Sequence, residues 1–372
     1  VVPGFEVRRL PLPVEILPIS LAWISERDAR DRNHERIVLG SLKGRVWTAT
    51  DGDGDGLEDT VTLMSDELAS PYGLATGEGY VDVLTKYGVI RLGDDDRDGH
   101  AERSQLVASG WGHTEYYHDW AVGLPSDNQG GYFMALPCQQ DDRVAAAARW
   151  RGRILRLVPR TPTTQDPREF EIVEYASGQR FPMGLARNQN GDLFATDNQG
   201  NYNPFNELNH IRQGLHYGFI NKRDRRGGPR PSLTRPAINI PHPWTRSVNG
   251  ICFLETPEGS KERRFGPFEG HLIGCEYDTR RLIRMTLEEV DGWLQGSAYP
   301  MAEAATESET GLQGPINCGI SSDGDLYITN IRDSGWGGGS NTGSIVRIVP
   351  KLDELPVGIA EVTATKSGFR IT

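Results

Sequence analysis

Cysteine is scarce in this sequence, whose 372 residues include only Cys138, Cys252, Cys275 and Cys318. None of them forms a Cys-x-x-Cys pair, and this argues against a zinc ribbon. Two alternatives stay open for Cys252 and Cys275, namely a bridge within one sheet or a pair of buried free thiols.

Long apolar runs and an excess of positive charge are also missing. No run reaches the length of about 18 apolar residues that a membrane-spanning helix needs. The chain has 51 Asp and Glu against 40 Lys and Arg, which gives a net charge of −11. Because this charge repels nucleic acid and anionic lipid, we exclude both as partners. The first 13 residues lack the basic-then-apolar pattern of a signal peptide, so we expect a mature or trimmed chain.

Helical periodicity is nearly absent. One segment, residues 286–295 (TLEEVDGWLQ), has a helical pattern. Turn-forming residues are abundant instead, with 44 glycines and 23 prolines. Many turns imply many short strands, so the sequence predicts an all-β fold.

Acidic residues gather in two short segments with the same spacing. The first, residues 50–60 (TDGDGDGLEDT), has the pattern D-x-D-x-D-G-x-x-D between two β-like flanks, and residues 94–102 repeat it 43 residues later. Carboxylates at this spacing suit Ca²⁺, although Thr62 stands where a helix–loop–helix hand has its bidentate Glu. We predict two structural calcium sites in β-hairpins, with solvated acidic turns as the alternative. The expected metal ligands are Asp51, Asp53, Asp55, Asp59, Asp94, Asp96, Asp98 and Glu102.

Internal repeats with a period of about 44 residues organise the chain. Six segments read as the opening of a unit, and six later segments read as the strand that follows. Four short strands in each of six units predict a six-bladed β-propeller, with the calcium-binding loops in the first two blades. The expected divisions are an N-terminal extension at 1–18, the propeller at 19–350, and a linker or the start of a further domain at 351–372. The openings are 19–25, 70–85, 118–136, 181–200, 247–255 and 314–333, and the later strands are 44–50, 88–94, 152–158, 206–212, 280–286 and 343–349.

Propellers bind ligands where loops from several blades converge on the axis, so polar residues beside the innermost strands are the candidates for a site. His118 and Asp119 precede one such strand, where a histidine next to a carboxylate can act as a general base or can simply bond to backbone. Asp197 and Glu207 belong to the densest polar tract, which suits sugar hydroxyls but also ordinary turns. Trp336 lies in a glycine-rich loop. Its ring suits a stacking platform for a sugar, and it equally suits packing against the last blade.

Three of these tracts resemble the quinoprotein soluble glucose dehydrogenase and sorbosone dehydrogenase families. They are GQRFPMGLA (178–186), DNQGNYNPFNELNHIRQGLHYGF (197–219) and the segment of His118. The nearest likeness is to the sugar-dehydrogenase-like propeller module of large secreted bacterial proteins. The resemblance implies oxidation of sugars with pyrroloquinoline quinone (PQQ) and calcium. It also implies that His118 accepts the sugar hydroxyl proton, that Arg180 contacts cofactor and substrate, and that Gln199, Gly200 and Asn201 occupy the positions that bind the active-site calcium.

The sequence departs from this pattern at other positions. Phe181 replaces an asparagine of the family motif, Asp278 replaces a lysine of the fifth blade, and Pro315–Asn317 replaces an Arg-x-Arg of the sixth. A quinone with three carboxylates needs cationic partners. The cations left for this task are Arg180, Arg246, Arg280 and Arg332.

Three classes of function follow from the residues and the resemblance. The first is a quinoprotein-type aldose dehydrogenase that acts on a carbohydrate or small polyol and passes electrons to a cytochrome-type acceptor. The second is a cofactor-free glycan-cleaving enzyme that uses His118, Asp119, Asp197 or Glu207 as acid and base. The third is a calcium-stabilised module that binds carbohydrate or protein without catalysis. Calcium loops of this kind lead us to expect a periplasmic or extracellular location.

Overall fold

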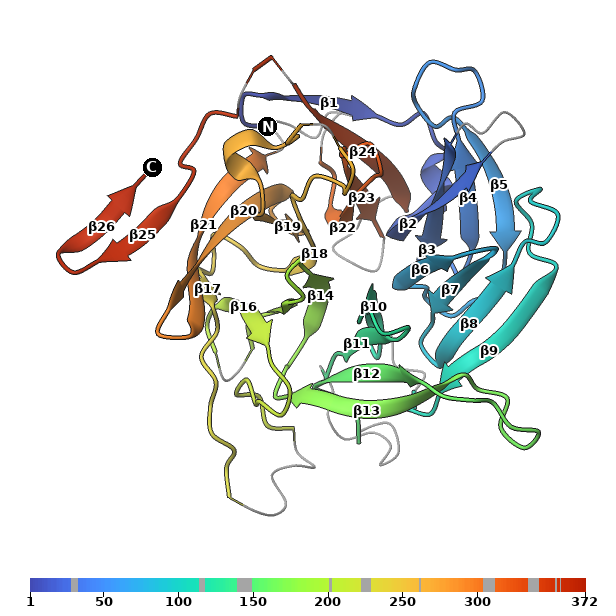
Figure 1. Cartoon of the computed structure of the whole chain (residues 1–372), viewed down its shortest axis with the longest axis horizontal. Helices are drawn as coiled ribbons and strands as arrows, with labels where there is room; N and C mark the ends of the chain where they lie inside the picture. Colours follow the sequence, from blue (N-terminus) through green and yellow to red (C-terminus); the bar gives the residue numbers. More distant parts are fainter. Residues whose placement is uncertain are drawn as a thin grey trace.

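The protein is an all-β, six-bladed β-propeller in which six four-stranded antiparallel sheets surround a central axis (Figure 1). This architecture confirms the fold predicted from the repeats. The computed structural model describes residues 1–27, 33–113, 118–138, 149–200, 203–221, 229–260, 262–303, 312–333, 341–351, 353–354 and 356–372.

The first three blades follow the chain order, each starting at the axis and ending at the outer edge. Blade 1 contains β2 (Pro18–Arg27), β3 (Asn33–Ser41), β4 (Val46–Thr50) and β5 (Thr60–Ser65). Blade 2 contains β6 (Gly73–Gly77), β7 (Tyr80–Leu84), β8 (Gly88–Gly93) and β9 (Arg103–Ser109). Blade 3 contains β10 (Val122–Ser126), β11 (Tyr132–Leu136), β12 (Arg153–Pro159) and β13 (Phe170–Ser177).

Blades 4 and 5 repeat this order, whereas blade 6 takes its outer strand from the start of the chain. Blade 4 contains β14 (Pro182–Arg187), β15 (Leu193–Asp197), β16 (Asn206–Ile211) and β17 (Ile238–Ile240). Blade 5 contains β18 (Val248–Phe253), β19 (Leu272–Glu276), β20 (Arg281–Val290) and β21 (Trp293–Glu303). Blade 6 contains β22 (Pro315–Ile320), β23 (Leu326–Arg332), β24 (Thr342–Pro350) and β1 (Phe5–Arg9), and two 3₁₀ turns lie at Val14–Ile16 and Gly266–Phe268.

The N-terminal strand closes the ring. β1 pairs antiparallel with β24, from Phe5 opposite Pro350 to Arg9 opposite Val346. Blade 6 therefore combines residues from both parts of the chain, although the sequence indicated an extension at residues 1–18. A separate hairpin of β25 (Val362–Thr365) and β26 (Gly368–Ile371) lies outside the ring beside β21 (Figure 1).

The six segments predicted to open the units overlap the innermost strands of the six blades, and the six later segments overlap the third strands. The one helix suggested by the sequence, at residues 286–295, is wrong. This segment forms the end of β20, the two-residue turn that follows it and the start of β21. Asp291 and Gly292 have φ values of 52° and 78°, which suit the tight Asp-Gly turn of a twisted hairpin.

The hydrophobic core is divided among the spaces between blades. Six clusters of buried side chains each join two neighbouring blades, and a seventh lies at the axis. Each blade thus buries both faces of its sheet against its neighbours, so its stability depends on closure of the whole ring. All four cysteines are buried free thiols, which answers the question left open for Cys252 and Cys275. Within the described ranges, no helix has the length and apolar character needed to span a bilayer.

The innermost strands approach one another so closely that glycine is required at their contacts. A Cβ atom added to Gly73 of β6 would lie 1.6 Å from the carbonyl oxygen of Gly123 in β10. Similar close approaches join Gly184 to Asn249 and Gly250 to Asn317. Because backbone atoms meet backbone atoms at these points, a side chain here would force neighbouring blades apart.

We expect Gly73→Ala to lower the free energy of unfolding by about 2 kcal/mol, because overpacking at a fixed backbone contact carries a cost of this order. Urea unfolding measures the loss. Gly358→Ala is the matched control, since its added Cβ would meet only ordinary contacts, the nearest at 3.4 Å, and we expect a change within about 0.5 kcal/mol. Equal stability of the two variants would contradict the tight ring.

Candidate functional site

One end of the propeller axis carries the residues that the sequence indicated. The innermost strands β2, β6, β10, β14, β18 and β22 contact one another in a closed ring. Each begins at the face where the second strand of its blade ends, as the pairing of Pro182 with Asp197 illustrates. We call this the start face and the opposite one the end face. Residues just before an innermost strand or just after a second strand therefore converge at the start face.

His118 lies at this face, four residues before β10. Its ring packs against Trp120 at 5.3 Å and Phe181 at 6.0 Å between centroids. Burial lowers the pKa of His118, and the positive charge of Arg180 lowers it further. A neutral imidazole at neutral pH can accept a proton, as a general base must.

Aromatic rings close the axis beneath this histidine. Tyr72 and Trp120 lie 4.7 Å apart between centroids, and Trp120 lies 5.9 Å from Phe181. Tyr72 and Trp120 belong to the axial core cluster, together with Tyr277 from blade 5, and Phe181 packs against it. The sequence analysis did not single out Tyr72, Trp120 or Tyr277, although their places beside the first or second strand of a repeat could have indicated them.

Arg180 is positioned by hydrogen bonds from its backbone N–H and from its guanidinium. The carboxylate of Asp197 accepts the backbone N–H groups of Arg180 at 2.7 Å and Phe181 at 2.5 Å. The guanidinium of Arg180 donates to the carbonyl oxygen of Gln199 at 2.8 Å. Asp197, with 1% of its surface exposed, therefore positions the strand entrance instead of facing a substrate.

The same device recurs in the next two blades. In blade 5, Glu276 accepts the backbone N–H groups of Arg246 and Ser247, both at 2.8 Å. In blade 6, the side-chain oxygen of Asn330 accepts the N–H of Gln313 at 3.2 Å. In blades 4, 5 and 6, an acceptor at or near the end of the second strand thus fixes the backbone before the first strand, while the side chain presented there varies.

Charges of both signs meet at the start face of blades 5 and 6. Burial raises the pKa of Asp278, and so does the nearby Glu276, whereas Arg246 and Arg332 act in the opposite direction. Asp278 therefore lies within electrostatic range of two arginines. Between the adjacent blades 1 and 6, Lys43 forms an ion pair with Asp333 at 3.1 Å.

Glu207 lies below this surface, on β16. It is 4% exposed, it accepts a hydrogen bond from Asn209 at 3.1 Å, and Asn203 donates to it as well. Burial raises the pKa of Glu207 to about 7, and the negative charge of Asp197 contributes. Such a pKa suits proton transfer, but the carboxylate is buried and already accepts hydrogen bonds from Asn203 and Asn209.

The remaining predicted residues fall into two groups. Asp119 is buried, and Gly200 lies against Arg180, whose Cδ would be 3.0 Å from an added Cβ. Asn201 and Trp336 lie outside the described residues. The structure thus gathers His118, Arg180, Gln199 and Gly200 near one another around the entrances of blades 3 and 4.

The two acidic loops lie away from the axis and share one internal geometry. In each loop the first carboxylate accepts the N–H of the glycine at position 6, as Gly56 donates to Asp51 at 2.9 Å and Gly99 to Asp94 at 3.1 Å. The carboxylate at position 9 accepts the N–H of the second residue, from Gly52 to Asp59 at 2.9 Å and from Asp95 to Glu102 at 2.7 Å.

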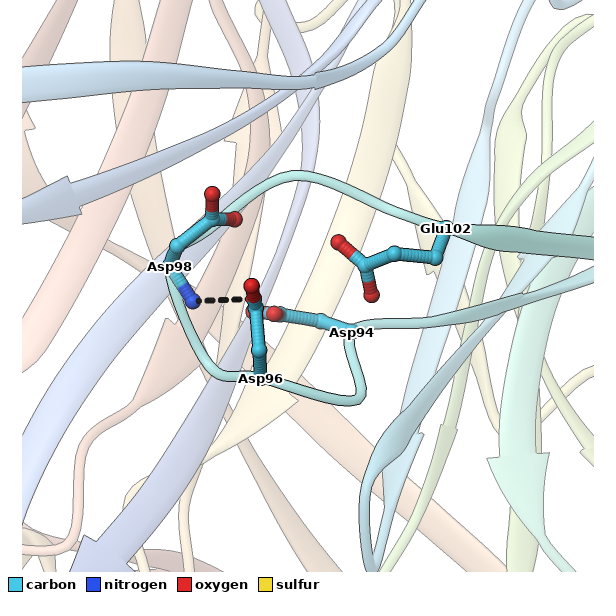
Figure 2. A group of neighbouring side chains, drawn as sticks. All are labelled: Asp94, Asp96, Asp98 and Glu102. Carbon is cyan, nitrogen blue, oxygen red and sulfur yellow. Dashed lines mark hydrogen bonds between the residues drawn. The ribbon is translucent and has the colours of Figure 1, made fainter.

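Both loops have a composition that could hold a metal ion. Ligand atoms of Asp94, Asp96, Asp98 and Glu102 lie within 4.8 Å of one another on a single turn (Figure 2). In the first loop the corresponding group contains Asp51, Asp53 and Asp55, without Asp59. Oxygen ligands at these separations fit Ca²⁺, which takes six to eight of them.

A cavity of about 610 Å³ opens at the other end of the axis. Its walls include the later parts of the innermost strands and the turns that follow, among them Pro125, Gln189 and Ser322. Neither His118 nor Arg180 lines it. The predicted chemical groups therefore lie at the start face, and this cavity lies toward the end face.

Comparison with known proteins supports the fold. A model of the family described as "Domain of unknown function (DUF7133)" matches residues 26–234, more than half of the chain. No curated protein matches the sequence.

Solved structures show the same propeller at low sequence identity. An oxidoreductase from Thermus thermophilus, described as a glucose dehydrogenase, is 19% identical with a TM-score of 0.62 over 93% of this chain and 100% of that chain. The PQQ-bound aldose sugar dehydrogenase of Streptomyces coelicolor is 17% identical with a TM-score of 0.56 over 94% and 100%. The soluble aldose sugar dehydrogenase of Escherichia coli is 15% identical with a TM-score of 0.57 over 93% and 99%.

Replacing Arg180 should raise the pKa of His118. In Arg180→Gln the positive charge beside the imidazole is gone, but burial remains, so the pKa should rise while staying below its ordinary value of about 6.5. NMR titration of the histidine ring measures this pKa. Arg246→Gln, in another blade, should leave it unchanged, and an unchanged pKa in Arg180→Gln would contradict the coupling.

Glu207 should make the protein less stable as pH rises. Its folded-state pKa of about 7 lies above the ordinary value of 4.5, so the folded state binds a proton that the unfolded state releases between these pH values. Stability contributed by this proton is lost as pH rises through 7, by an amount of about 3 kcal/mol.

Urea unfolding at pH 5 and pH 8 checks this dependence. Glu207→Gln should reduce the loss of stability between the two pH values, whereas Glu289→Gln, at an exposed position, should behave as the unmodified protein. An undiminished loss in Glu207→Gln would show that another group is responsible.

Proposed function

The chain belongs to the family described as a domain of unknown function (DUF7133), and we propose that it is a carbohydrate-active propeller that oxidises a sugar in the manner of quinoprotein aldose dehydrogenases. The observation that carries this proposal is the place of His118 at the start face, where burial and the positive charge of Arg180 lower its pKa. The structural likeness to PQQ-bound aldose sugar dehydrogenase supports this class of reaction.

These residues suit the oxidation of a sugar hydroxyl. The reaction removes a proton from the hydroxyl oxygen and a hydride from its carbon, and a carbonyl group forms. His118 takes the proton at a ring nitrogen, and Arg180 stabilises the negative charge that develops on the oxygen. Tyr72, Trp120 and Phe181 form an apolar floor beneath His118. When bound, PQQ supplies the acceptor for the hydride.

The fit of the quinone depends on cations at the start face. Its three carboxylates need positive partners, because unpaired ions removed from water cost several kcal/mol each. Arg180, Arg246 and Arg332 come from three successive blades, and they would hold these groups. The negative charge of Asp278 opposes two of them, since it lies within electrostatic range of Arg246 and Arg332. Lys43 is engaged by Asp333.

The proposal includes calcium ions of two kinds, one structural and one near the proposed site of reaction. We assign structural Ca²⁺ to both acidic loops, with the ligands expected from the sequence. By the resemblance, the carbonyl groups of Gln199, Gly200 and Asn201 would hold a second kind of calcium ion, although the Gln199 carbonyl oxygen already accepts a hydrogen bond from Arg180. Because extracellular fluids and the periplasm supply calcium and sugars, we place the protein in one of them, with a cytochrome-type electron acceptor as its partner.

The cofactor-free alternative receives less support. A pair of catalytic carboxylates must reach the glycosidic bond from both sides. Asp197 and Glu207 are both almost fully buried, and Asp197 accepts two backbone N–H groups. Their burial indicates a structural role at the entrance of β14.

Quinone binding followed by dye reduction tests the proposal. We expect the protein with Ca²⁺ to bind PQQ in a calorimetric titration and to reduce a redox dye with one or more aldoses. His118→Ala should lower kcat by a factor of about 100 or more and leave quinone binding intact, because only the base is lost. Asp278→Asn should tighten quinone binding by roughly fivefold, because one like charge is removed.

Other outcomes would select another class of function. Release of products from oligosaccharides without an electron acceptor would indicate a glycan-cleaving enzyme. Sugar binding without turnover, in the presence of PQQ and Ca²⁺, would indicate a binding module. Failure to bind PQQ at all would overturn the dehydrogenase proposal.

A further inference from the structure

The second acidic loop belongs to blade 2 but lies against blade 1. It connects β8 to β9, and its backbone reaches the outer strand of the preceding blade. The N–H of Ala101 donates to the carbonyl oxygen of Met64 at 3.0 Å, and the ring nitrogen Nδ1 of His100 lies 2.7 Å from the carbonyl oxygen of Leu63. A Cβ added to Gly99 would lie 3.1 Å from a methyl carbon of Thr62, so the turn is in close contact with β5.

One oxygen atom inside this loop is buried without a hydrogen-bond partner in the described part of the chain. Asp94 is 93% buried, since 7% of its surface is exposed. Its Oδ2 accepts hydrogen bonds from Gly99 at 3.1 Å and from Arg36 of blade 1 at 3.3 Å. Its Oδ1 is buried and has no hydrogen-bond partner among the described residues. Because a buried, unsatisfied carboxylate oxygen is costly, this atom points to a ligand that the protein itself does not provide.

The surrounding donors define the chemistry of that ligand. Asp96, Asp98 and Glu102 each bring a carboxylate oxygen to within 4.8 Å of Asp94 (Figure 2). One Arg36 guanidinium does not balance four carboxylates, so the remaining charge favours a divalent cation. Hard oxygen ligands on a turn with the glycine at position 6 suit Ca²⁺ better than Mg²⁺, which demands near-ideal octahedral geometry.

We propose that a calcium ion bound by Asp94, Asp96, Asp98 and Glu102 fastens blade 2 to blade 1. The ion draws the carboxylates together and fixes the turn in the shape whose outer side meets Leu63 and Met64. Without the ion, repulsion among the carboxylates opens the turn and weakens these contacts between blades. This inference rests on the calcium occupancy proposed above and is independent of the sugar chemistry.

The first acidic loop differs in a way that makes it a natural control. It connects β4 to β5 in blade 1 and lies against blade 6, where Arg347 donates to the carbonyl oxygen of Gly56 at 2.6 Å and Tyr327 donates to Glu58 at 3.0 Å. Both oxygens of Asp51 already accept backbone N–H groups, from Gly54 at 2.7 Å and Gly56 at 2.9 Å. Its attachment to the neighbouring blade thus uses an arginine and a tyrosine, so it depends less on an ion.

Two paired variants separate binding of calcium from its effect on the blades. The test variant is Asp96→Asn with Asp98→Asn, and the control is Asp53→Asn with Asp55→Asn at the same positions of the first loop. Calorimetric titration of the metal-free protein with CaCl₂ measures binding, and thermal unfolding in CaCl₂ or EGTA measures stability. At free calcium about 100-fold above Kd, one site should raise Tm by about 3 °C. The test variant should lose the shift due to the second loop, and the control should keep it.

Hydrogen exchange at the Ala101 amide reports the contact between blades directly. We expect calcium to slow this exchange in the unmodified protein and in the control, and to have no effect in the test variant. Absence of calcium binding at this loop would overturn both the occupancy and the inference. Binding at the loop without slower exchange at Ala101 would overturn only the link between blades and would leave the proposed calcium site in place.

Discussion

Closure of the ring is the constraint on which the rest of the structure depends. Each blade shares a buried cluster with each neighbour, so no blade has a complete core of its own. Pairing of β1 with β24 joins the beginning of the chain to its last blade and completes the circle. Close contacts such as that between Gly73 and Gly123 then fix the radius of the innermost strands. The geometry of the start face follows from this radius, because every residue there precedes or follows a strand of the ring.

Most of the fold could be predicted because each repeat in the sequence corresponds to one blade. Turn pairs such as Asn190-Gly191 and Asp323-Gly324 separate the first and second strands, and the alternation of apolar residues marks the strands on either side. Two features could not be read in this way. The exchange of β1 into blade 6 is a long-range pairing with no local signal. The hairpin at Asp291-Gly292 was mistaken for a helix because its acidic and apolar residues also suit helical spacing, and sheet pairing decided the outcome.

The candidate site was predictable in part, and for a different reason. The placement of His118 and Arg180 at one face follows from their positions before innermost strands, which the repeats reveal. The roles of Asp197 and Glu207 do not follow, because a polar residue after a strand can point to solvent or inward. Here the acceptor at the end of a second strand points inward, toward the N–H groups of the next entrance. Tyr72 and Trp120 were missed because an aromatic residue beside a strand is usually part of the core, and at the axis it is both core and floor.

The acceptors at the ends of the second strands also explain how one structural frame can hold divergent chemistry. Asp197, Glu276 and Asn330 bind backbone N–H groups, so the conformation of the entrance does not depend on the side chain displayed there. Arg180 and Arg246 occupy this position in blades 4 and 5, and Gln313 occupies it in blade 6. A substitution at such a position therefore changes the charge of the start face and leaves the hydrogen bonds of the backbone in place. Likeness of fold at 17% identity therefore carries information about the propeller and little about the ligand. Backbone hydrogen bonds determine the shape of the strand entrances, whereas the displayed side chains determine what binds there.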